Sequence, residues 1–216
     1  MIANIHIEGS GILLTTFMWI LMMTVMMAPV VFPWIVNFAE FTRDIESGAF
    51  RYGWMALFCS GYLVLWSAFS LVGALLQLSL RSWGLLGASA ALSTPLAGFI
   101  LIGAGTYQLT PLKNACLRHC RNPMGYFLSR WRDGPTGAFR MGISHGFYCV
   151  GCCWALMLTV FGLGLMNLMW MVALMLLISV ETFAPRGEQF GKIAGLALVV
   201  WGLFLLGGRQ IISIIG

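Results

Sequence analysis

Long apolar stretches dominate this chain of 216 residues and limit what it can fold into. A helix that crosses the hydrocarbon core of a bilayer needs about 20 consecutive apolar residues. Six stretches meet or approach that length, and they cover residues 12–34, 54–78, 84–108, 141–163, 166–183 and 190–213. Charged residues make up only 9% of the chain, whereas a soluble domain carries about 25%. The sequence therefore predicts an all-α, polytopic membrane bundle of about six spans, organised as one domain over residues 1–216.

Charged side chains predict how these spans are oriented. The segments after the first, third and fifth stretches hold all Lys and Arg residues except Arg81 and Arg209. Because positive loops stay in the cytoplasm, we expect both termini outside a bacterial inner membrane and the long loop 109–140 inside. Within that loop, residues 124–132 mix aromatic and basic side chains, which is typical of a short interfacial helix. Glu181 is predicted to be interfacial, rather than a ligand or a partner of an arginine.

The predicted span 141–163 carries an unusual polar face. Its members lie at i, i+4, i+7 and i+8, and they are His145, Cys149, Cys152 and Cys153. At about 100° per residue they share a face about 100° wide. Ionisable groups are costly inside a membrane, and imidazole and thiolate are preferred ligands of Cu(I) and Zn(II). The face therefore predicts a metal site. The alternative is that the cysteines are small packing residues and that His145 is hydrogen-bonded within the bundle.

The first stretch offers further ligands, because it contains two methionine pairs spaced one turn apart. They are Met22 with Met26 and Met23 with Met27. Thioethers bind Cu(I) or Ag(I) well and Zn(II) poorly, so copper is the expected metal and zinc is less favoured. Counting about 1.5 Å per residue from Trp34 and from Met141 makes Met26 and Cys149 level with each other. The two groups are therefore predicted to meet, although methionines that only fill packing gaps are the alternative.

The long loop contains a third group with the spacing Cys-x-x-His-Cys. Its members are Cys116, His119 and Cys120, which share one face if the segment is helical. Lys113, Arg118 and Arg121 are close enough in sequence to be expected to lower the pKa values of these thiols. The group is a candidate cytoplasmic metal acceptor, and a plain basic loop is the alternative.

Several motifs of this chain resemble those of a known family. They are YQLTPLKNACLRHCR, GAFRMGISHGFYCVGCCWALM, MNLMWM and E-x-x-x-P-R-G between Tyr107 and Gly187, with Met-Met-x-x-Met-Met-Ala-Pro in the first stretch. In these motifs the chain is similar to a bacterial family of unknown function described as predicted metal-binding integral membrane proteins. The resemblance implies that the methionine segment and the two Cys/His groups are signature positions. It implies no catalytic role.

Three functional hypotheses follow from these residues. The leading one is a membrane protein that binds copper in its bundle and handles it or delivers it to a membrane metalloenzyme, with methionines as exchangeable ligands. The second is a membrane thiol-disulfide oxidoreductase that uses Cys149 and Cys152, with Cys116 and Cys120 as exchange partners. The third is an accessory structural subunit of a larger membrane complex.

Membrane lipid is a partner under all three hypotheses. A nucleotide is not expected because no P-loop is present. A nucleic acid is not expected because the net charge of +5 is explained by the positive loops at the membrane face. No catalytic residue is predicted, so a role other than that of an enzyme is favoured.

Overall fold

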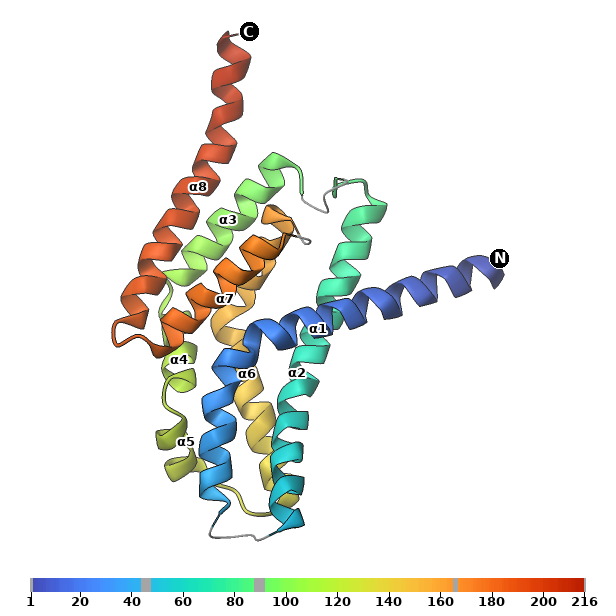
Figure 1. The fold of residues 1–216 in the computed structure, drawn as a ribbon. Helices are drawn as coiled ribbons and strands as arrows, with labels where there is room; N and C mark the ends of the chain where they lie inside the picture. Colours follow the sequence, from blue (N-terminus) through green and yellow to red (C-terminus); the bar gives the residue numbers. More distant parts are fainter. Residues whose placement is uncertain (1, 44–47, 88–91, 165–166, 216) are drawn as a thin grey trace. The chain divides into compact units, whose positions relative to one another are not determined.

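The computed structural model describes residues 2–43, 48–87, 92–164 and 167–215 of the chain. The described residues form eight helices and no strand, which confirms the all-α class (Figure 1). The helices are α1 (Ile2–Phe41), α2 (Ala49–Ser82), α3 (Thr94–Gln108), α4 (Pro111–Cys120), α5 (Pro123–Arg130), α6 (Gly134–Leu163), α7 (Leu168–Phe183) and α8 (Gly187–Ile215).

Four of these helices are long and apolar enough to cross a membrane. The qualifying segments are Gly11–Phe41, Phe50–Ser82, Gly134–Leu163 and Gly187–Gly207, and each overlaps a predicted span. The predicted spans 84–108 and 166–183 correspond to the shorter helices α3 and α7, of 15 and 16 residues. A helical membrane protein is therefore supported by length and composition, while the number of six spans stays a prediction.

The start of α3 differs from the sequence prediction. The predicted span begins at residue 84, but the helix begins at Thr94 and Pro95 lies in its first turn. Proline is tolerated there because the first N–H groups of a helix have no partner within it. Before α3, Leu86 pairs with Leu92 in an isolated bridge. The predicted boundary was wrong because a proline marks a helix start as readily as a kink.

Two short helices occupy the long loop. The helix predicted at residues 124–132 is α5, and α4 precedes it. Asn122 caps α5, because its side-chain oxygen accepts a hydrogen bond of 2.9 Å from the Gly125 N–H. Each of the two helices begins at a proline, Pro111 or Pro123. The cap and the prolines separate α4 from α5 and so fix where the Cys-x-x-His-Cys segment ends.

The chain divides into two compact units, and we describe each by itself. The first unit contains Met1–Ser79 and His119–Val150, and the second contains Leu80–Arg118 and Gly151–Gly216. Helix α6 belongs to both units, because its residues up to Val150 lie in the first and its residues from Gly151 lie in the second. The predicted single domain is not tested by this division.

In the first unit, α2 and α6 approach closely at glycines. A Cβ on Gly142 would collide with the backbone oxygen of Phe58, and one on Gly61 with the backbone oxygen of Phe139. Gly142 and Gly146 are four residues apart, as in the small-xxx-small pairs that let membrane helices pack backbone to backbone. This contact fixes the position of the residue next to Gly146, which is His145.

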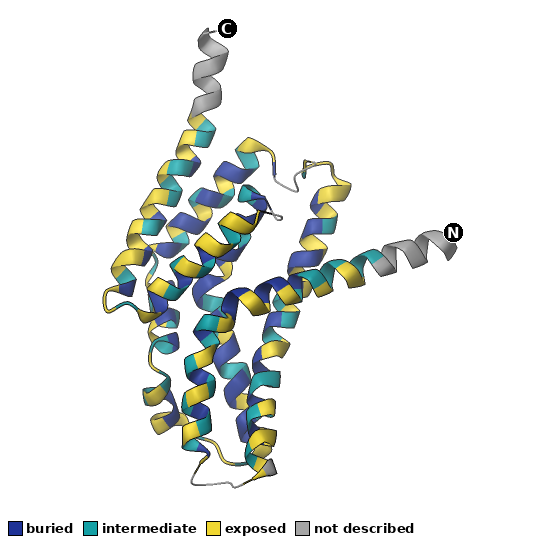
Figure 2. Ribbon diagram, viewed as in Figure 1, coloured by how far each residue is buried: buried dark blue, intermediate teal, exposed yellow. Residues whose placement is uncertain are grey.

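Helix α1 completes the core of the first unit. Pro29 and Pro33 lie inside it, and the helix is bent in Figure 1. A proline inside a helix removes one hydrogen bond and clashes with the preceding turn, so it bends the helix. Beyond the prolines, Trp34 and Phe38 are fully buried in a cluster that includes Phe58. Figure 2 shows buried and exposed residues alternating along the helices. The aromatic end of α1 therefore packs against both α2 and α5, since Phe127 belongs to the same cluster.

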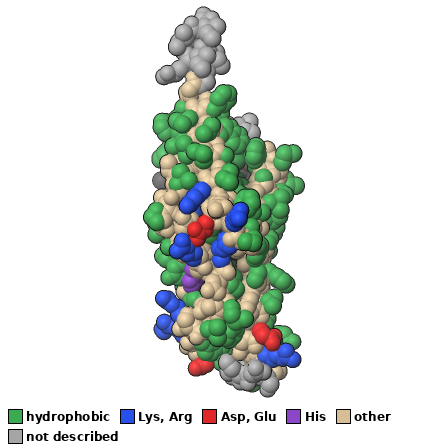
Figure 3. Space-filling model, turned by 90° about the vertical axis from the view of Figure 1, so that its left-hand side faces the viewer, with side chains coloured by type: hydrophobic (Ala, Val, Ile, Leu, Met, Phe, Trp, Pro, Cys, Tyr) green, Lys and Arg blue, Asp and Glu red, His purple; other side chains and the backbone are tan. Residues whose placement is uncertain are grey.

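In the second unit, α3 and α8 pack antiparallel through small residues. A Cβ on Gly105 would lie 2.5 Å from the Gly195 oxygen, and one on Gly202 would lie 2.7 Å from the Gly98 oxygen. Glycines at these points allow a backbone-to-backbone approach like that of α2 and α6. The opposite side of α8 exposes large apolar side chains, among them Phe204, which is 73% exposed. Figure 3 shows hydrophobic side chains spread over one face, with a group of basic and acidic side chains among them.

Candidate metal-binding sites

His145 is the most unusual buried residue of the first unit. Its side chain is 0% exposed and stacks on Trp34, with ring centroids 3.8 Å apart. Tyr62 stacks on it as well, at 5.4 Å. Neither Nδ1 nor Nε2 has a hydrogen-bond partner among the described residues. Stacking contacts the faces of the imidazole, so both nitrogens, which point outward in the ring plane, are left unsatisfied.

This arrangement argues against a purely structural role for His145. Buried polar atoms are almost always hydrogen-bonded, and leaving one unsatisfied costs about 1–3 kcal/mol. A histidine that served only packing would be expected to hydrogen-bond within the bundle, and no such bond forms in the described part of the chain. A ring nitrogen that lacks a proton is the group that binds a soft metal ion, so the geometry favours a ligand over a packing residue.

Cys149 lies one turn after His145 on α6. It is also 0% exposed, and its Sγ lies 3.5 Å from the hydroxyl oxygen of Tyr62. Tyr62 therefore contacts both residues, with its ring against the imidazole and its hydroxyl against the thiol. The first unit thus brings together one imidazole and one thiol in a site closed to solvent.

A second histidine contacts the same tryptophan. His119 stacks on Tyr148 at 3.8 Å and on Trp34 at 5.5 Å, and its Nε2 is buried without a hydrogen-bond partner. Burial, and then the positive charge of Arg130, lower the pKa of His119 from 6.5 to about 4. The imidazole is therefore neutral at pH 7 and able to act as a ligand.

Trp34 links these groups, and sequence reasoning missed it. Its ring stacks on both histidines, and its Nε1–H donates a 3.0 Å hydrogen bond to the backbone oxygen of Cys120. In the sequence, Trp34 follows an apolar stretch, where tryptophans often mark the membrane interface. That pattern does not distinguish a tryptophan at the membrane interface from one whose ring stacks on two histidines.

The methionines of α1 are buried, as a ligand role requires. Met23 and Met27 are 0% exposed, and Met22 and Met26 are 9% and 3% exposed. The depth count that made Met26 level with Cys149 treated Trp34 and Met141 as level with each other. In the structure Trp34 stacks on His145, one turn further along α6, and the helix bends at the prolines. The proximity of the thioethers to Cys149 therefore stays a prediction.

The remaining predicted ligands are divided between the units. His119 and Cys120 belong to the first unit, while Cys116, Cys152 and Cys153 belong to the second. All six cysteines are thiols rather than disulfides. Among the described residues, no three His, Cys, Asp or Glu side chains converge as a ready-made metal cage. The four-residue face predicted from the sequence therefore stays a prediction.

The expected effect of the basic residues on the loop thiols is wrong for Cys116. Burial, and then the nearby Cys152, raise the pKa of the Cys116 thiol. The basic residues are held by acidic ones, since Lys113 Nζ lies 2.6 Å from Glu181 Oε2 and Arg118 Nε lies 2.8 Å from Glu188 Oε1. Sequence proximity alone does not reveal this pairing.

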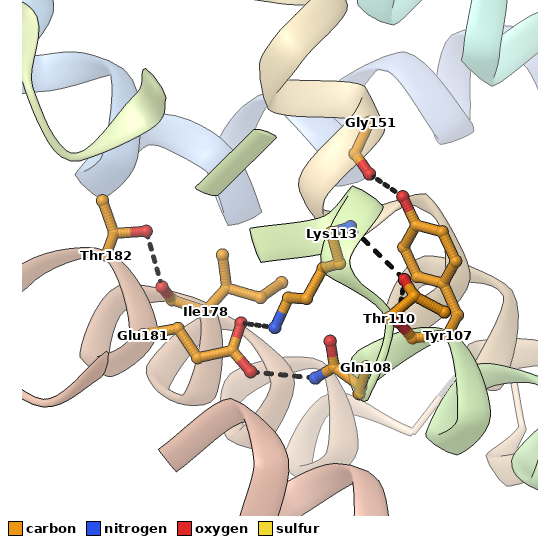
Figure 4. Close-up of polar contacts among 8 residues, drawn as sticks. All are labelled: Tyr107, Gln108, Thr110, Lys113, Gly151, Ile178, Glu181 and Thr182. Atoms are coloured by element: carbon orange, nitrogen blue, oxygen red, sulfur yellow. Dashed lines mark hydrogen bonds and ion pairs between the residues drawn. The ribbon is translucent and has the colours of Figure 1, made fainter. Parts of the chain in front are cut away.

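Glu181 is buried in the second unit, and its partner is a lysine rather than the arginine considered from the sequence. It is 2% exposed, its ion-pair partner Lys113 is 1% exposed, and Gln108 donates a 2.8 Å hydrogen bond to its second oxygen (Figure 4). A Cβ on Gly191 would lie 2.9 Å from Lys113 Nζ, so α8 covers the pair closely. The network joins α3, α4 and α7 within the second unit.

A cavity of about 490 Å³ lies in the first unit. Its lining includes the guanidinium groups of Arg130, Arg132 and Arg140 beside Tyr126 and Trp131. No thiol or imidazole lines it, and a cluster of positive charge repels a metal cation. It is therefore distinct from the site around His145.

Comparison with known proteins identifies a family. The family model described as "PpoB2: Copper chaperone" matches residues 16–205, which include every candidate ligand. The chain belongs to this family. No curated protein and no solved structure gave a match. Membership agrees with the predicted resemblance to metal-binding membrane proteins, and it confirms copper handling in coarse form.

For a PpoB2 copper chaperone, copper is cargo rather than a permanent cofactor. A delivered ion has to leave its ligands, which a complete cage of strong ligands would hinder.

Proposed function

We propose that this chain is an integral membrane copper chaperone that binds Cu(I) in its helical bundle and delivers it to a membrane metalloenzyme. The observation that carries the proposal is the fully buried imidazole of His145, whose two ring nitrogens have no partner among the described residues. Family membership supplies the cargo. The lipid-facing apolar helices support the membrane location.

His145 and Cys149 are the proposed core ligands. A thiolate selects Cu(I) over harder ions, and a neutral imidazole adds a nitrogen ligand without adding charge. Binding displaces the thiol proton of Cys149, so the affinity for copper rises with pH. The thioethers of Met22, Met23, Met26 and Met27 act as the exchangeable ligands, because weak thioether bonds let the ion leave.

The experiment measures Cu(I) binding to purified, reduced protein in detergent, in competition with a chromogenic Cu(I) chelator. We expect His145→Ala and Cys149→Ser each to weaken binding at this site by about tenfold or more, equivalent to about 1.4 kcal/mol or more. Cys59→Ser is the matched control, because Cys59 is a half-buried thiol of α2 that belongs to no proposed site. A His145→Ala protein that keeps the full copper content and affinity of the wild type would refute the assignment.

Alkylation in cells separates this function from disulfide exchange. A copper chaperone keeps Cys149 and Cys152 as thiols that a bound ion shields, so they react fully once a Cu(I) chelator is added. An oxidoreductase instead keeps a fraction oxidised, and a Cys152→Ser variant would trap a mixed disulfide with its partner. A trapped species of that kind would replace the chaperone proposal with the redox one.

The proposed orientation has its own test. We place both termini outside and the segment containing α4 and α5 in the cytoplasm, because the basic residues follow that pattern. The test replaces Ser129, an exposed residue of α5, by cysteine and then labels intact cells that carry this variant. An impermeant thiol reagent should not label this cysteine, and labelling from outside would invert the topology.

A further inference from the structure

In the second unit, a cysteine of α4 packs against the turn of α6 that carries another cysteine. The Sγ of Cys116, on α4, lies 3.0 Å from the point where a Cβ on Gly151 would stand. Gly151 directly precedes Cys152 on α6. The Cys116 side chain therefore rests on the backbone of the turn that carries Cys152. The two come from separate predicted groups, one in the loop and one in the apolar span.

Burial, and after it Cys152, raise the pKa of the Cys116 thiol. Repulsion between two thiolates is relieved when a cation binds both of them. The backbone beside them is fixed as well, because the Tyr107 hydroxyl donates a hydrogen bond to the carbonyl oxygen of Gly151 (Figure 4).

We propose that Cys116 and Cys152 form a two-thiol Cu(I) site in the second unit, separate from His145 and Cys149. This inference rests on the proposed function for the identity of the cargo. Two thiolates are a sufficient ligand set for Cu(I), which is a soft ion that accepts few ligands. Binding releases one proton from each thiol and leaves the ion bridging two sulfurs, with no change in oxidation state.

The exposure of the two cysteines suggests how copper reaches this site. Cys116 is partly exposed, whereas Cys152 is 3% exposed. An incoming carrier that holds Cu(I) on its own thiolates reaches Cys116 first. Exchange of one sulfur for another then moves the ion onto Cys152. The site therefore receives copper from a thiol-bearing donor on the side of the molecule where α4 lies.

Gly151 allows the close approach of Cys116. A Cβ at this position would lie 3.0 Å from the Cys116 sulfur, which is tighter than ordinary contact, so the sulfur would have to move. Gly151→Ala should therefore shift the Cys116 sulfur away from the turn of Cys152 without removing either thiol. Gly103→Ala, on α3 of the same unit, is the matched control because nothing lies within 4 Å of its added Cβ.

The first experiment tests proximity without copper. Reduced wild-type protein in detergent is treated with dibromobimane, which becomes fluorescent when it bridges two thiols, and the bridged peptides are identified by mass spectrometry. We expect a bridge between Cys116 and Cys152, blocked when Cu(I) is bound and much reduced in Gly151→Ala. Absence of that bridge from the wild type would overturn the proposal, even if every variant failed to fold.

The second experiment counts copper in variants. A His145→Ala/Cys149→Ser protein should still bind about one equivalent of Cu(I), which the further change Cys116→Ser removes. Unchanged copper after Cys116→Ser, or no copper in the double variant, would overturn the two-thiol site. Failure of the proposed function gives a different result, because the double variant would then bind as much copper as the wild type.

Discussion

The two units each bury a polar group, and they treat it in opposite ways. In the second unit, Glu181 is 2% exposed and is held by both Lys113 and Gln108. In the first unit, His145 is more deeply buried, and both of its nitrogens lack a partner in the described part of the chain. A satisfied buried group contributes to the fold, whereas an unsatisfied one costs stability unless something binds it. The contrast therefore separates a buried polar group that stabilises the fold, Glu181, from one that we propose binds a ligand, His145.

The largest expected effect comes from breaking the satisfied group. Glu181→Leu leaves the ammonium of Lys113 buried and uncompensated, which should lower the free energy of unfolding by about 3–5 kcal/mol. Thermal unfolding in detergent measures the loss. The double variant Lys113→Met/Glu181→Leu is the control, and it should recover most of the stability because no charge remains buried. Equal losses in the single and double variants would contradict the ion-pair account.

An intermediate effect is expected where α2 and α6 pack. Gly142→Ala places a methyl group against the Phe58 carbonyl, so it should cost about 1–3 kcal/mol by overpacking. It should also weaken copper binding, because it moves the helix that carries His145 without changing a ligand. Gly53→Ala on α2 has open space around its Cβ and should leave both measurements nearly unchanged. Copper binding and unfolding are measured on the same preparations.

A smaller effect, and of opposite sign, is expected for the unsatisfied group. His145→Phe keeps an aromatic ring between Trp34 and Tyr62 but removes the two unpartnered nitrogens. The metal-free variant should be as stable as the wild type or more stable by about 1 kcal/mol, while it loses the copper ligand. A clear loss of stability in the metal-free variant would indicate that the imidazole has a structural partner after all.

A further effect, expected only at acidic pH, is a dependence of stability on pH. The pKa of His119 is about 4 in the folded protein and 6.5 as its ordinary value, because burial and then Arg130 disfavour the charged ring. Its contribution to stability is therefore fully present above pH 6.5 and is lost as the pH falls through 4. His119→Phe should flatten the dependence of the melting temperature on pH between these values. An unchanged pH profile would show that another group titrates.

The sequence predicted the helical class, and it predicted which helices carry the candidate ligands, but it did not predict the contacts between helices. Apolar length alone identifies the long helices, because a membrane-spanning segment leaves little choice of composition. Spacing on one helix also places His145 and Cys149 on one face correctly. Spacing along one helix does not show which other helices contact it. The pairing of Lys113 with Glu181, and of Cys116 with the Gly151 turn, depends on the packing of separate elements.

Trp34 and Glu181 illustrate why the remainder was missed. Each has a common explanation at the end of an apolar stretch, as an interfacial aromatic or an interfacial acid. Their roles depend on partners that are distant in the sequence. Trp34 contacts His119, which is 85 residues away, and Glu181 pairs with Lys113, which is 68 residues away. Local patterns carry no information on such partners.

The most direct test of the central claim is whether copper stabilises the first unit through His145. In a Cys116→Ser background, which removes the two-thiol site, the melting temperature is measured with and without Cu(I) at about 100 times the dissociation constant. A protein with His145 should gain about 2.7 kcal/mol of stability, because the ion binds the folded state alone. The same protein carrying His145→Phe should gain about 1.4 kcal/mol or less, because its dissociation constant is expected to be at least about tenfold higher. An equal gain with and without the imidazole would contradict the claim that His145 is buried to hold copper.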